Sequence, residues 1–459
     1  MDPIATIQQS AAIAIGRLSN HAPAIADEVT SLGMLNQVVK NLSHDNKYFK
    51  KTASFVVRGV AKHSETQAKA VVSAGAVPGL VTSLNDFEPS VKESAIWALG
   101  YIARHSVELA QTVVDAGALP LLISCYREPE VSLKRIAAST LGDIARHNEA
   151  LSTVVAQGGI LPQMVKDIDS SDVGLRRQAI NCLSQVAKHS TESAEGLVAL
   201  DVLPRIILSL KDLNEGVRKN ACILIREISR QSENLSKVVV SSGGIAGLCE
   251  YLNDSRGVCR IPAIMSLGYI SAFSETLALA VIVTSAVVSL KTCLIEEPED
   301  CVKGASAWAL SQVGKHSPEH ARALAEGEVL RRLLAVHLHA ESSDDLKSKS
   351  KKALKAVLSQ LTLVSHLEAM LLDSPKKILK LVVRQLAKVL TNDIAGRKQL
   401  VQSGSLKRIQ RIEAEPGSKL ALAIQSLNSL YPQEVVNFYS PQYPEQLMKK
   451  LDAPPSISA

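Results

Sequence analysis

A fixed period of 42 residues most restricts how this chain can fold. Its marker is a basic residue, a histidine and then Ser or Asn; from position 21 to 273 each step is 42 residues, and the last step, to 316, is 43. The marker histidines are His21, His63, His105, His147, His189 and His316. A period of this length is typical of helical units that bury their apolar faces only against neighbouring units.

A second set of equivalent positions, one in each repeat, follows the same period and marks where a helix should end. We call such a set a column. Its members are Gly33, Gly75, Gly117, Gly159, Asp201, Gly243, Ser285 and Gly327. Glycine is favoured there because it adopts the left-handed backbone conformation that ends many helices. Within one unit, Ser106 is a candidate N-cap, and the pattern predicts a helix ending at Val114, a second ending near Tyr126 and a third over 132–145.

The period divides the chain into three expected regions. Residues 1–340 hold about eight units, of which the first is partial; residues 341–430 form divergent capping repeats; residues 431–459 form a Pro-rich tail that wraps the protein or is loosely ordered. The Lys-rich run Lys347–Lys355 suits the polar outer face that a terminal repeat needs. Gly404 repeats the glycine column in this region.

Composition excludes several classes of protein. The chain has 51 Lys and Arg against 45 Asp and Glu, an excess too small for a dedicated nucleic-acid binder. The longest weakly polar stretch, Leu277–Leu290, is too short to span a bilayer, and no secretory signal follows Met1. The seven cysteines form no C-x-x-C pair, as expected for reduced thiols in the cytosol. We therefore expect no nucleic-acid partner and no membrane insertion.

Two columns in the third helix are rich in Lys and Arg and predict rows of positive charge along the stacked repeats. We call these two columns the basic ladder. At 100° per residue, these positions lie on a different face from the apolar stripe. The first column, near the start of each third helix, holds Lys51, Glu93, Arg135, Arg177, Lys219, Ile261 and Gly304. The last column, at the end of each third helix, holds Lys62, Arg104, Arg146, Lys188, Arg230, Ala272 and Lys315.

We expect the ladder to bind an extended acidic partner, such as an acidic tubulin tail or an acidic scaffold segment, by repeated charge pairing. A structural alternative applies to the last column, because cations at a helix C-terminus stabilise the helix dipole. The dipole disfavours cations in the first column. Trp97 and Trp308 hold equivalent places in their repeats and are candidate groove anchors, although packing between repeats is an equal alternative.

No arrangement for catalysis, metal binding or a cofactor is expected. Ligands of one zinc ion must all lie about 2.0–2.1 Å from it, and histidines one repeat apart cannot converge in this way. We expect the marker histidines to contact helix-end carbonyls instead. His316 and His320 stand at i and i+4 but lack a third ligand. Neither a Walker sequence nor a nucleophile elbow is present, so we expect no enzyme.

Several segments resemble a known family. The run Lys92–Leu99 resembles the third helix of an armadillo repeat, which implies an all-α armadillo solenoid with a right-handed superhelix. The Ala-Arg-His and Glu-Leu-Ala repeats, the segment Ala305–Leu310 and the pair Ser440-Pro441 resemble the sperm-associated antigen six family, armadillo proteins of the axonemal central pair. Members of that family carry further helices upstream, so we expect a shortened N-terminus and an uncovered side on the helix over 4–18.

The resemblance implies a function. It suggests a microtubule-associated scaffold of the axonemal central apparatus that supports the structure and beating of cilia and flagella and acts in sperm motility. The implied partners are tubulin or microtubules, other central-apparatus proteins and acidic segments, with self-association through the ends as a further candidate. The implied location is cytoplasm, cytoskeleton and axoneme. The alternative is a cytoplasmic armadillo adaptor in signalling or trafficking with no axonemal role.

Overall fold

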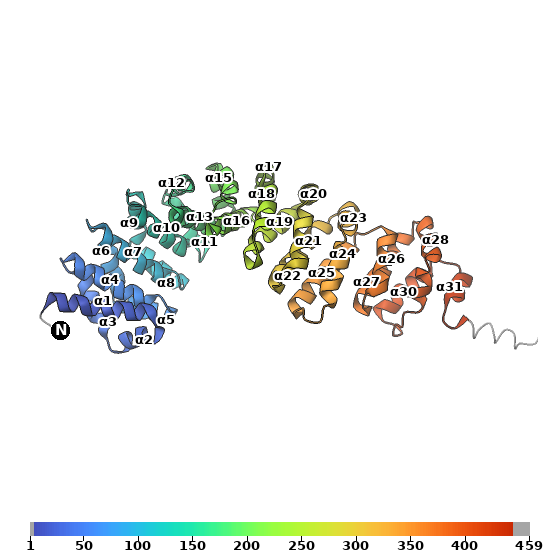
Figure 1. Ribbon diagram of the computed structural model, residues 1–459, viewed down its shortest axis with the longest axis horizontal. Coiled ribbons are helices and arrows are strands. Elements are labelled where there is room, and N and C mark those ends of the chain that lie inside the picture. Colours follow the sequence, from blue (N-terminus) through green and yellow to red (C-terminus); the bar gives the residue numbers. More distant parts are fainter. Residues whose placement is uncertain (1–3, 444–459) are drawn as a thin grey trace, which may run out of the picture. The chain divides into compact units, whose positions relative to one another are not determined.

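The computed structural model describes residues 4–443, and all of its regular elements in that range are helices (Figure 1). The chain forms two compact units, residues 1–247 and 248–459. Residues 444–459, which include most of the expected Pro-rich tail, lie outside the described residues.

The first unit repeats the expected three-helix pattern. Its third helices are α1 (Ala5–His21), α4 (Lys47–Ala61), α7 (Pro89–Ala103), α10 (Val131–Ala145), α13 (Val173–Ala187) and α16 (Glu215–Ser229). Its first helices are α2 (Pro23–Ser31), α5 (Glu65–Ser73), α8 (Val107–Asp115), α11 (Glu149–Gln157), α14 (Thr191–Ala199) and α17 (Glu233–Ser241). Its second helices are α3 (Met34–Lys40), which η1 (Asn41–Ser43) follows, α6 (Ala76–Ser83), α9 (Ala118–Arg127), α12 (Leu161–Asp167), α15 (Val202–Ser209) and α18 (Gly244–Asp254), whose end belongs to the second unit.

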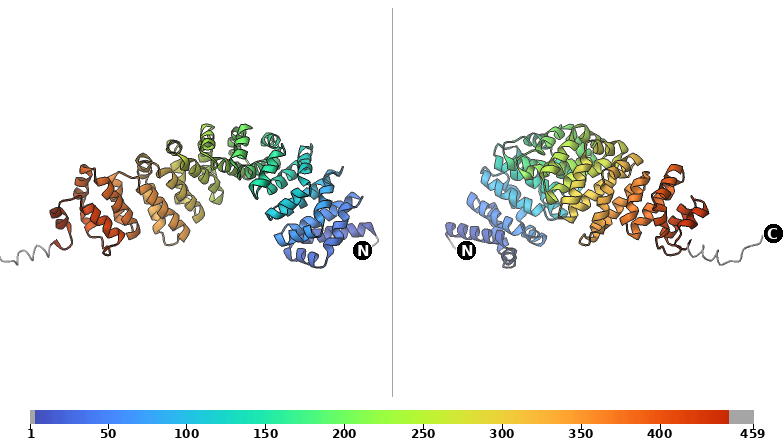
Figure 2. Two further views of the ribbon diagram at one scale, coloured as in Figure 1. Left: turned by 180° about the vertical axis from the view of Figure 1, so that it is seen from behind. Right: turned by 45° about the vertical axis from the view of Figure 1, so that its right-hand side comes forward.

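Third helices of successive repeats pack side by side and bury the predicted stripe. Contacts run from α1 to α4, α7, α10, α13 and α16 in turn, and the stacking is visible from both sides (Figures 1 and 2). Ala137, Leu141 and Ile144 of α10 are completely buried. Each fully buried aliphatic side chain contributes roughly 1.5–3 kcal/mol relative to exposure, so the stacked repeats stabilise one another.

The expected helix signals act as predicted. Ser106 accepts a hydrogen bond from the Leu109 backbone N–H at 3.4 Å, and its equivalents Ser64, Asn148, Ser190 and Ser232 cap their helices in the same way. Gly117 has φ +80°, and the column members from Gly33 to Ser285 are left-handed as well.

The second unit continues the pattern and then shortens it. It contains η2 (Gly257–Arg260), α19 (Ile261–Phe273), α20 (Glu275–Val283), α21 (Ala286–Glu296), α22 (Asp300–Gly314), α23 (Pro318–Glu326), α24 (Val329–Leu338), α25 (Asp344–Leu358), α26 (Val364–Asp373), α27 (Lys376–Leu390), α28 (Ile394–Gln402), α29 (Ser405–Gln410), α30 (Lys419–Asn428) and α31 (Gln433–Tyr439). Two helices separate α22 from α25, but α26 alone separates α25 from α27. The segment after residue 431, expected as a tail, thus begins with a short helix.

The prediction is wrong for one member of the glycine column. Gly327 has φ −74°, and the left-handed residue is Glu328, with φ +61°. The extra residue in the last step of the histidine marker explains the shift, since Glu328 follows Ser285 by the same 43 residues that separate 273 from 316. Gly404, with φ +76°, takes the expected role.

Two further observations concern apolar helices. The helix α1 carries exposed Ile7, Ile13 and Leu18. Within residues 4–443 no single helix is long and apolar enough to cross a bilayer, while the bent pairs α8–α9 and α20–α21 reach that length and composition only together.

Candidate protein-binding face of the repeats

The marker histidines join successive third helices. His63, His105 and His147 donate from Nε2 to the carbonyl oxygens of Ser19, Ala61 and Ala103, at 2.6, 2.7 and 2.7 Å. His189 and His316 contact the carbonyls of Arg146 and Ser271 in the same manner. The expected contact with helix-end carbonyls is present, and the helix belongs to the preceding repeat.

The environment of four of these imidazoles favours the neutral form. Burial lowers the pKa of His105, His147, His189 and His316, against the opposing effect of the backbone hydrogen bond. Since a carbonyl oxygen only accepts, Nε2 carries the proton in the neutral ring. No group of three or more potential ligands among His, Cys, Asp and Glu lies close enough to hold a metal ion in the part of the chain that the structure describes.

The last column of the ladder is largely engaged within the protein. Lys62 Nζ donates to the Asn20 carbonyl at 3.0 Å, Lys188 Nζ to that of Arg146 at 3.1 Å, and an Arg230 nitrogen to that of Lys188 at 2.8 Å. Each acceptor lies 42 residues upstream, at the end of the preceding third helix. These contacts agree with the structural alternative, in which cations stabilise the C-terminal end of a helix. Here the stabilised helix end belongs to the preceding repeat.

Other cations of this column contact their own helix. Arg146 lies 3.7 Å from Asp143, Arg104 stacks over the Tyr101 ring at 5.4 Å, and Lys315 Nζ donates to Gln312 at 2.6 Å. Burial raises the pKa of Asp143 to about 6, while Arg104 and Arg146 oppose that shift.

The first column is different, because its cations have no anionic partner. Lys51, Arg135 and Arg177 are exposed and Lys219 is half-buried, and none of the four forms an ion pair within residues 4–443. A cation near a helix N-terminus gains nothing from the dipole, so this charge must be stabilised by solvent or by a ligand.

Glycines in the next repeat hold two of these arginines extended. The Arg135 side chain crosses Gly174, where a Cβ atom would lie 2.6 Å from Arg135 Cδ. Arg177 crosses Gly216 in the same way, with 3.0 Å to Cδ. In the repeat before, Glu93 takes the equivalent position and accepts a hydrogen bond from Ser132. The stems of Arg135 and Arg177 thus pack against the following third helix.

Trp97, Arg135 and Arg177 line one cleft. This cleft, of about 280 Å³, lies between α7, α10 and α13, and both polar and apolar side chains complete it, among them Ser139 and Ile136. Trp97 also lies 5.6 Å from Arg58, which stacks on Phe55 as well. The structure therefore brings together three residues that the sequence proposed separately.

Trp308 has the other role that the sequence allowed. Its ring lies against Gly268, where a Cβ atom would come within 2.2 Å, and it meets Tyr269 edge-on at 5.1 Å. Trp308 thus packs between α22 and α19 and is an inter-repeat contact.

A neighbouring column of ion pairs was missed from sequence. Lys50 pairs with Asp86 at 2.8 Å, Lys92 with Glu128 at 2.6 Å and Arg176 with Asp212 at 2.8 Å. Each acid lies in the next repeat, 36 residues on, before the third helix. The fixed spacing of 36 residues was the available signal. These pairs neutralise the cations that immediately precede Lys51, Glu93 and Arg177.

The buried thiols show no sign of reactivity. Burial raises the pKa of Cys125 and Cys293 to about 11 and that of Cys182 to about 12. A protonated thiol is a poor nucleophile, so these cysteines act as small apolar residues of the core.

The stacked three-helix units define an all-α solenoid of the armadillo type. The family model for the armadillo/beta-catenin-like repeat matches residues 64–104 and 106–146. A crystal structure of an engineered protein shares the fold with a TM-score of 0.73, at 20% identity, over 86% of this chain and 98% of that chain.

Within this class, the chain is similar to sperm-associated antigen 6. The protein of Homo sapiens is 51% identical over 164 residues, which cover 36% of this chain and 32% of that protein. The protein of Mus musculus is 50% identical over a match of the same extent. The matched region thus spans about a third of the length of these relatives.

Proposed function

We propose that this chain is a non-enzymatic, microtubule-associated scaffold of the axonemal central apparatus, in which it supports ciliary and flagellar structure, beating and sperm motility. The proposal rests on the unpaired first column, Lys51, Arg135, Arg177 and Lys219. The column provides repeated positive charge on stacked helices, and the cations that precede Lys51 and Arg177 are neutralised by acids of the same chain. Similarity to sperm-associated antigen 6 supports the axonemal setting.

The acidic tails of tubulin are the partner that this face suits. Repeated weak charge pairs between an extended acidic segment and a row of cations add up, because after the first contact the others form within one complex. Opposite potentials also accelerate association and make it sensitive to salt. The last-column cations lie at the opposite end of the same helices, and their main contacts are structural.

Localisation of a tagged chain in a ciliated cell tests this proposal against a cytoplasmic adaptor role. We expect label along the axoneme that persists after detergent extraction. Label that is diffuse in the cytosol and washes out completely would contradict the axonemal role and favour the adaptor.

A further inference from the structure

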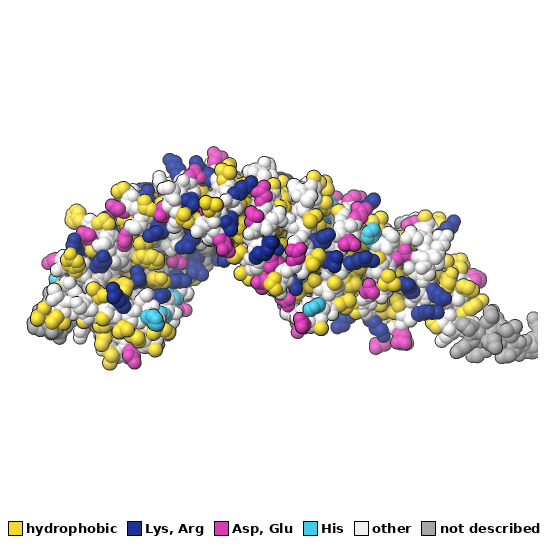
Figure 3. Space-filling view, viewed as in Figure 1, with side chains coloured by type: hydrophobic (Ala, Val, Ile, Leu, Met, Phe, Trp, Pro, Cys, Tyr) yellow, Lys and Arg dark blue, Asp and Glu magenta, His cyan; other side chains and the backbone are white. Residues whose placement is uncertain are grey.

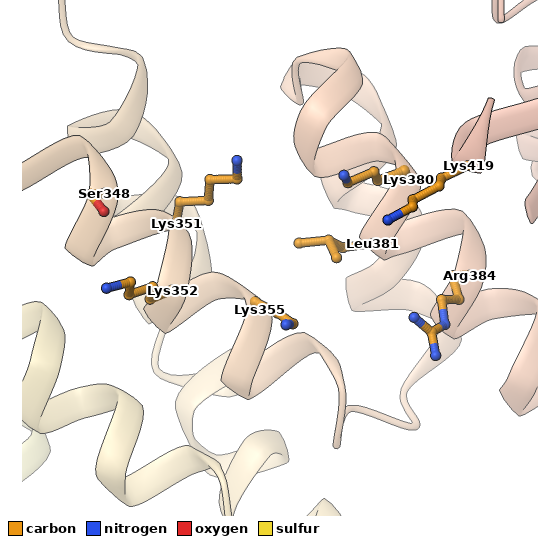
Figure 4. Close-up of a pocket in the computed structure, with 8 residues that line it drawn as sticks. All are labelled: Ser348, Lys351, Lys352, Lys355, Lys380, Leu381, Arg384 and Lys419. Carbon is orange, nitrogen blue, oxygen red and sulfur yellow. The ribbon is translucent and has the colours of Figure 1, made fainter. Parts of the chain in front are cut away.

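The second unit contains a basic cleft that lies outside the ladder. The cleft, of about 420 Å³, lies between α25, α27 and α30 (Figure 4). Its cations are Lys351, Lys352 and Lys355 from α25, Lys380 and Arg384 from α27, and Lys419 from α30. Lys351, Lys380 and Lys419 extend towards the space between the helices, as does Leu381 (Figure 4).

Among the described residues, no acidic side chain lines this cleft. None of its six cations forms an ion pair with another described residue of the chain, and in Figure 3 several Lys and Arg side chains are visible over the part of the unit that carries α27 and α30. Like charges so close together destabilise the fold unless counterions or a ligand neutralise them. The cleft is therefore suited to an anionic ligand.

The shortened repeat explains why a cleft exists here. Elsewhere two helices connect successive third helices, whereas α26 alone connects α25 to α27. The third helices on either side are separated by this change, and long cationic side chains line the space instead of a buried apolar stripe. The Lys-rich run that suits a solvated outer face thus forms one wall of a concave site.

The cleft continues as an elongated groove. A second hollow, of about 330 Å³, shares Lys355, Leu381 and Arg384 with the first and adds Lys388 of α27. At 1.5 Å per residue, the row from Lys380 to Lys388 extends over about 12 Å. An extended chain covers this distance with about four residues. A single phosphate group is too small to meet cations distributed over such a length.

We propose that this groove binds an acidic peptide segment of a partner protein, with Leu381 receiving an apolar side chain between the acidic ones. A single-stranded nucleic acid fits less well, because the lining has no aromatic residue on which a base could stack. The site lies in the second unit and is independent of the first-column ladder, so either proposal can fail without the other.

Fluorescence anisotropy on the full chain tests the groove directly. The probe is a labelled peptide of sequence Glu-Glu-Leu-Glu-Glu-Glu, at about 50 mM salt, where exposed charges are weakly screened. K380E/R384E reverses two charges of the groove, and K351Q/K419Q removes two without reversal. The matched control, K398E/K407E, reverses two exposed charges of the same unit outside the groove. Circular dichroism establishes that each variant is folded.

We expect K380E/R384E to weaken peptide binding by about tenfold or more, K351Q/K419Q by a few-fold, and the control to bind as the unchanged chain does. Three results would overturn the proposal. The first is equal binding by all variants, and the second is loss of binding only in the ladder variant R135E/R177E/K219E. The third is tighter binding of an oligoadenylate with the same dependence on the groove, which would identify nucleic acid as the ligand.

Discussion

His147 donates a hydrogen bond to the carbonyl oxygen of Ala103, 44 residues upstream and one repeat away, at 2.7 Å. The contact satisfies an acceptor at the end of α7 that the helix itself leaves unpaired. Five marker histidines make such a bond, and Gln231 makes it in one of the two repeats in which another residue replaces the histidine, with 2.8 Å to the Ala187 carbonyl. The strongest motif of the sequence is therefore a joint between repeats.

Two substitutions of His147 distinguish the effect of losing this hydrogen bond from the effect of losing side-chain volume. We expect His147→Ala to destabilise the protein by about 1–2 kcal/mol, because the Ala103 carbonyl loses its partner. His147→Gln should lose much less, because Gln231 makes the same contact in its own repeat. Urea unfolding followed by circular dichroism measures both. Equal destabilisation by the two substitutions would contradict the role of the hydrogen bond.

Acidification should weaken the joints. Burial lowers the pKa of His105, His147, His189 and His316 below the ordinary value of 6.5, so their contribution to stability is complete above that pH and is lost as the pH falls through the lowered values. Asp143, with its pKa raised to about 6, has the opposite sign. We expect the thermal midpoint to fall from pH 7.5 to pH 5.5 by more in the natural chain than in H105Q/H147Q/H189Q/H316Q. An equal fall would contradict the assignment.

Close packing at Gly268 predicts a large effect from one methyl group. In Gly268→Ala the added Cβ would lie 2.2 Å from the Trp308 ring, so we expect a loss of about 1–3 kcal/mol. Gly196→Ala, in α14, is the control, since a Cβ meets nothing within 4 Å there and alanine favours the helix. Thermal unfolding of the two variants should shift in opposite directions. An unshifted Gly268→Ala would mean that Trp308 is not packed as described.

Substitutions in the last column should affect stability, whereas substitutions in the first column should affect binding. K188M/R230M removes two hydrogen bonds to helix-end carbonyls, for each of which we expect a loss of about 0.5–1.5 kcal/mol, and also the ion pair of Arg230 with the buried Glu227 at 3.0 Å. R135M/R177M removes unpaired charges and should leave the unfolding midpoint nearly unchanged while it weakens binding to an acidic partner. Urea unfolding and a binding titration on the same preparations give the comparison. A reversed pattern would assign the binding face to the last column.

Local signals in the sequence were sufficient for the helices and their ends. Ser106 and Gly117 act through their own backbone neighbourhood, which the sequence displays directly. The sequence did not show the partner of each side chain across repeats. It therefore left Trp97 and Trp308 equivalent, although one lines a cleft and the other packs on Gly268.

The basic groove was not predicted from the sequence, because it too depends on contacts between repeats. The lysines of α25 are obvious in the sequence, but their meeting with Lys380, Arg384 and Lys419 depends on the missing helix between α25 and α27. A shortened repeat changes which faces lie opposite each other, and periodicity alone does not show this.

Microtubule co-sedimentation of charge-reversal variants tests the central claim most directly. R135E/R177E/K219E reverses three unpaired cations of the first column, and K40E/K166E/K398E reverses three exposed cations elsewhere. At about 50 mM salt we expect the first variant to bind microtubules about tenfold or more weakly than the natural chain, with a smaller dependence on salt, and the control to bind nearly as well as the natural chain. Unchanged affinity and salt dependence in R135E/R177E/K219E would contradict the claim that this column holds the acidic partner.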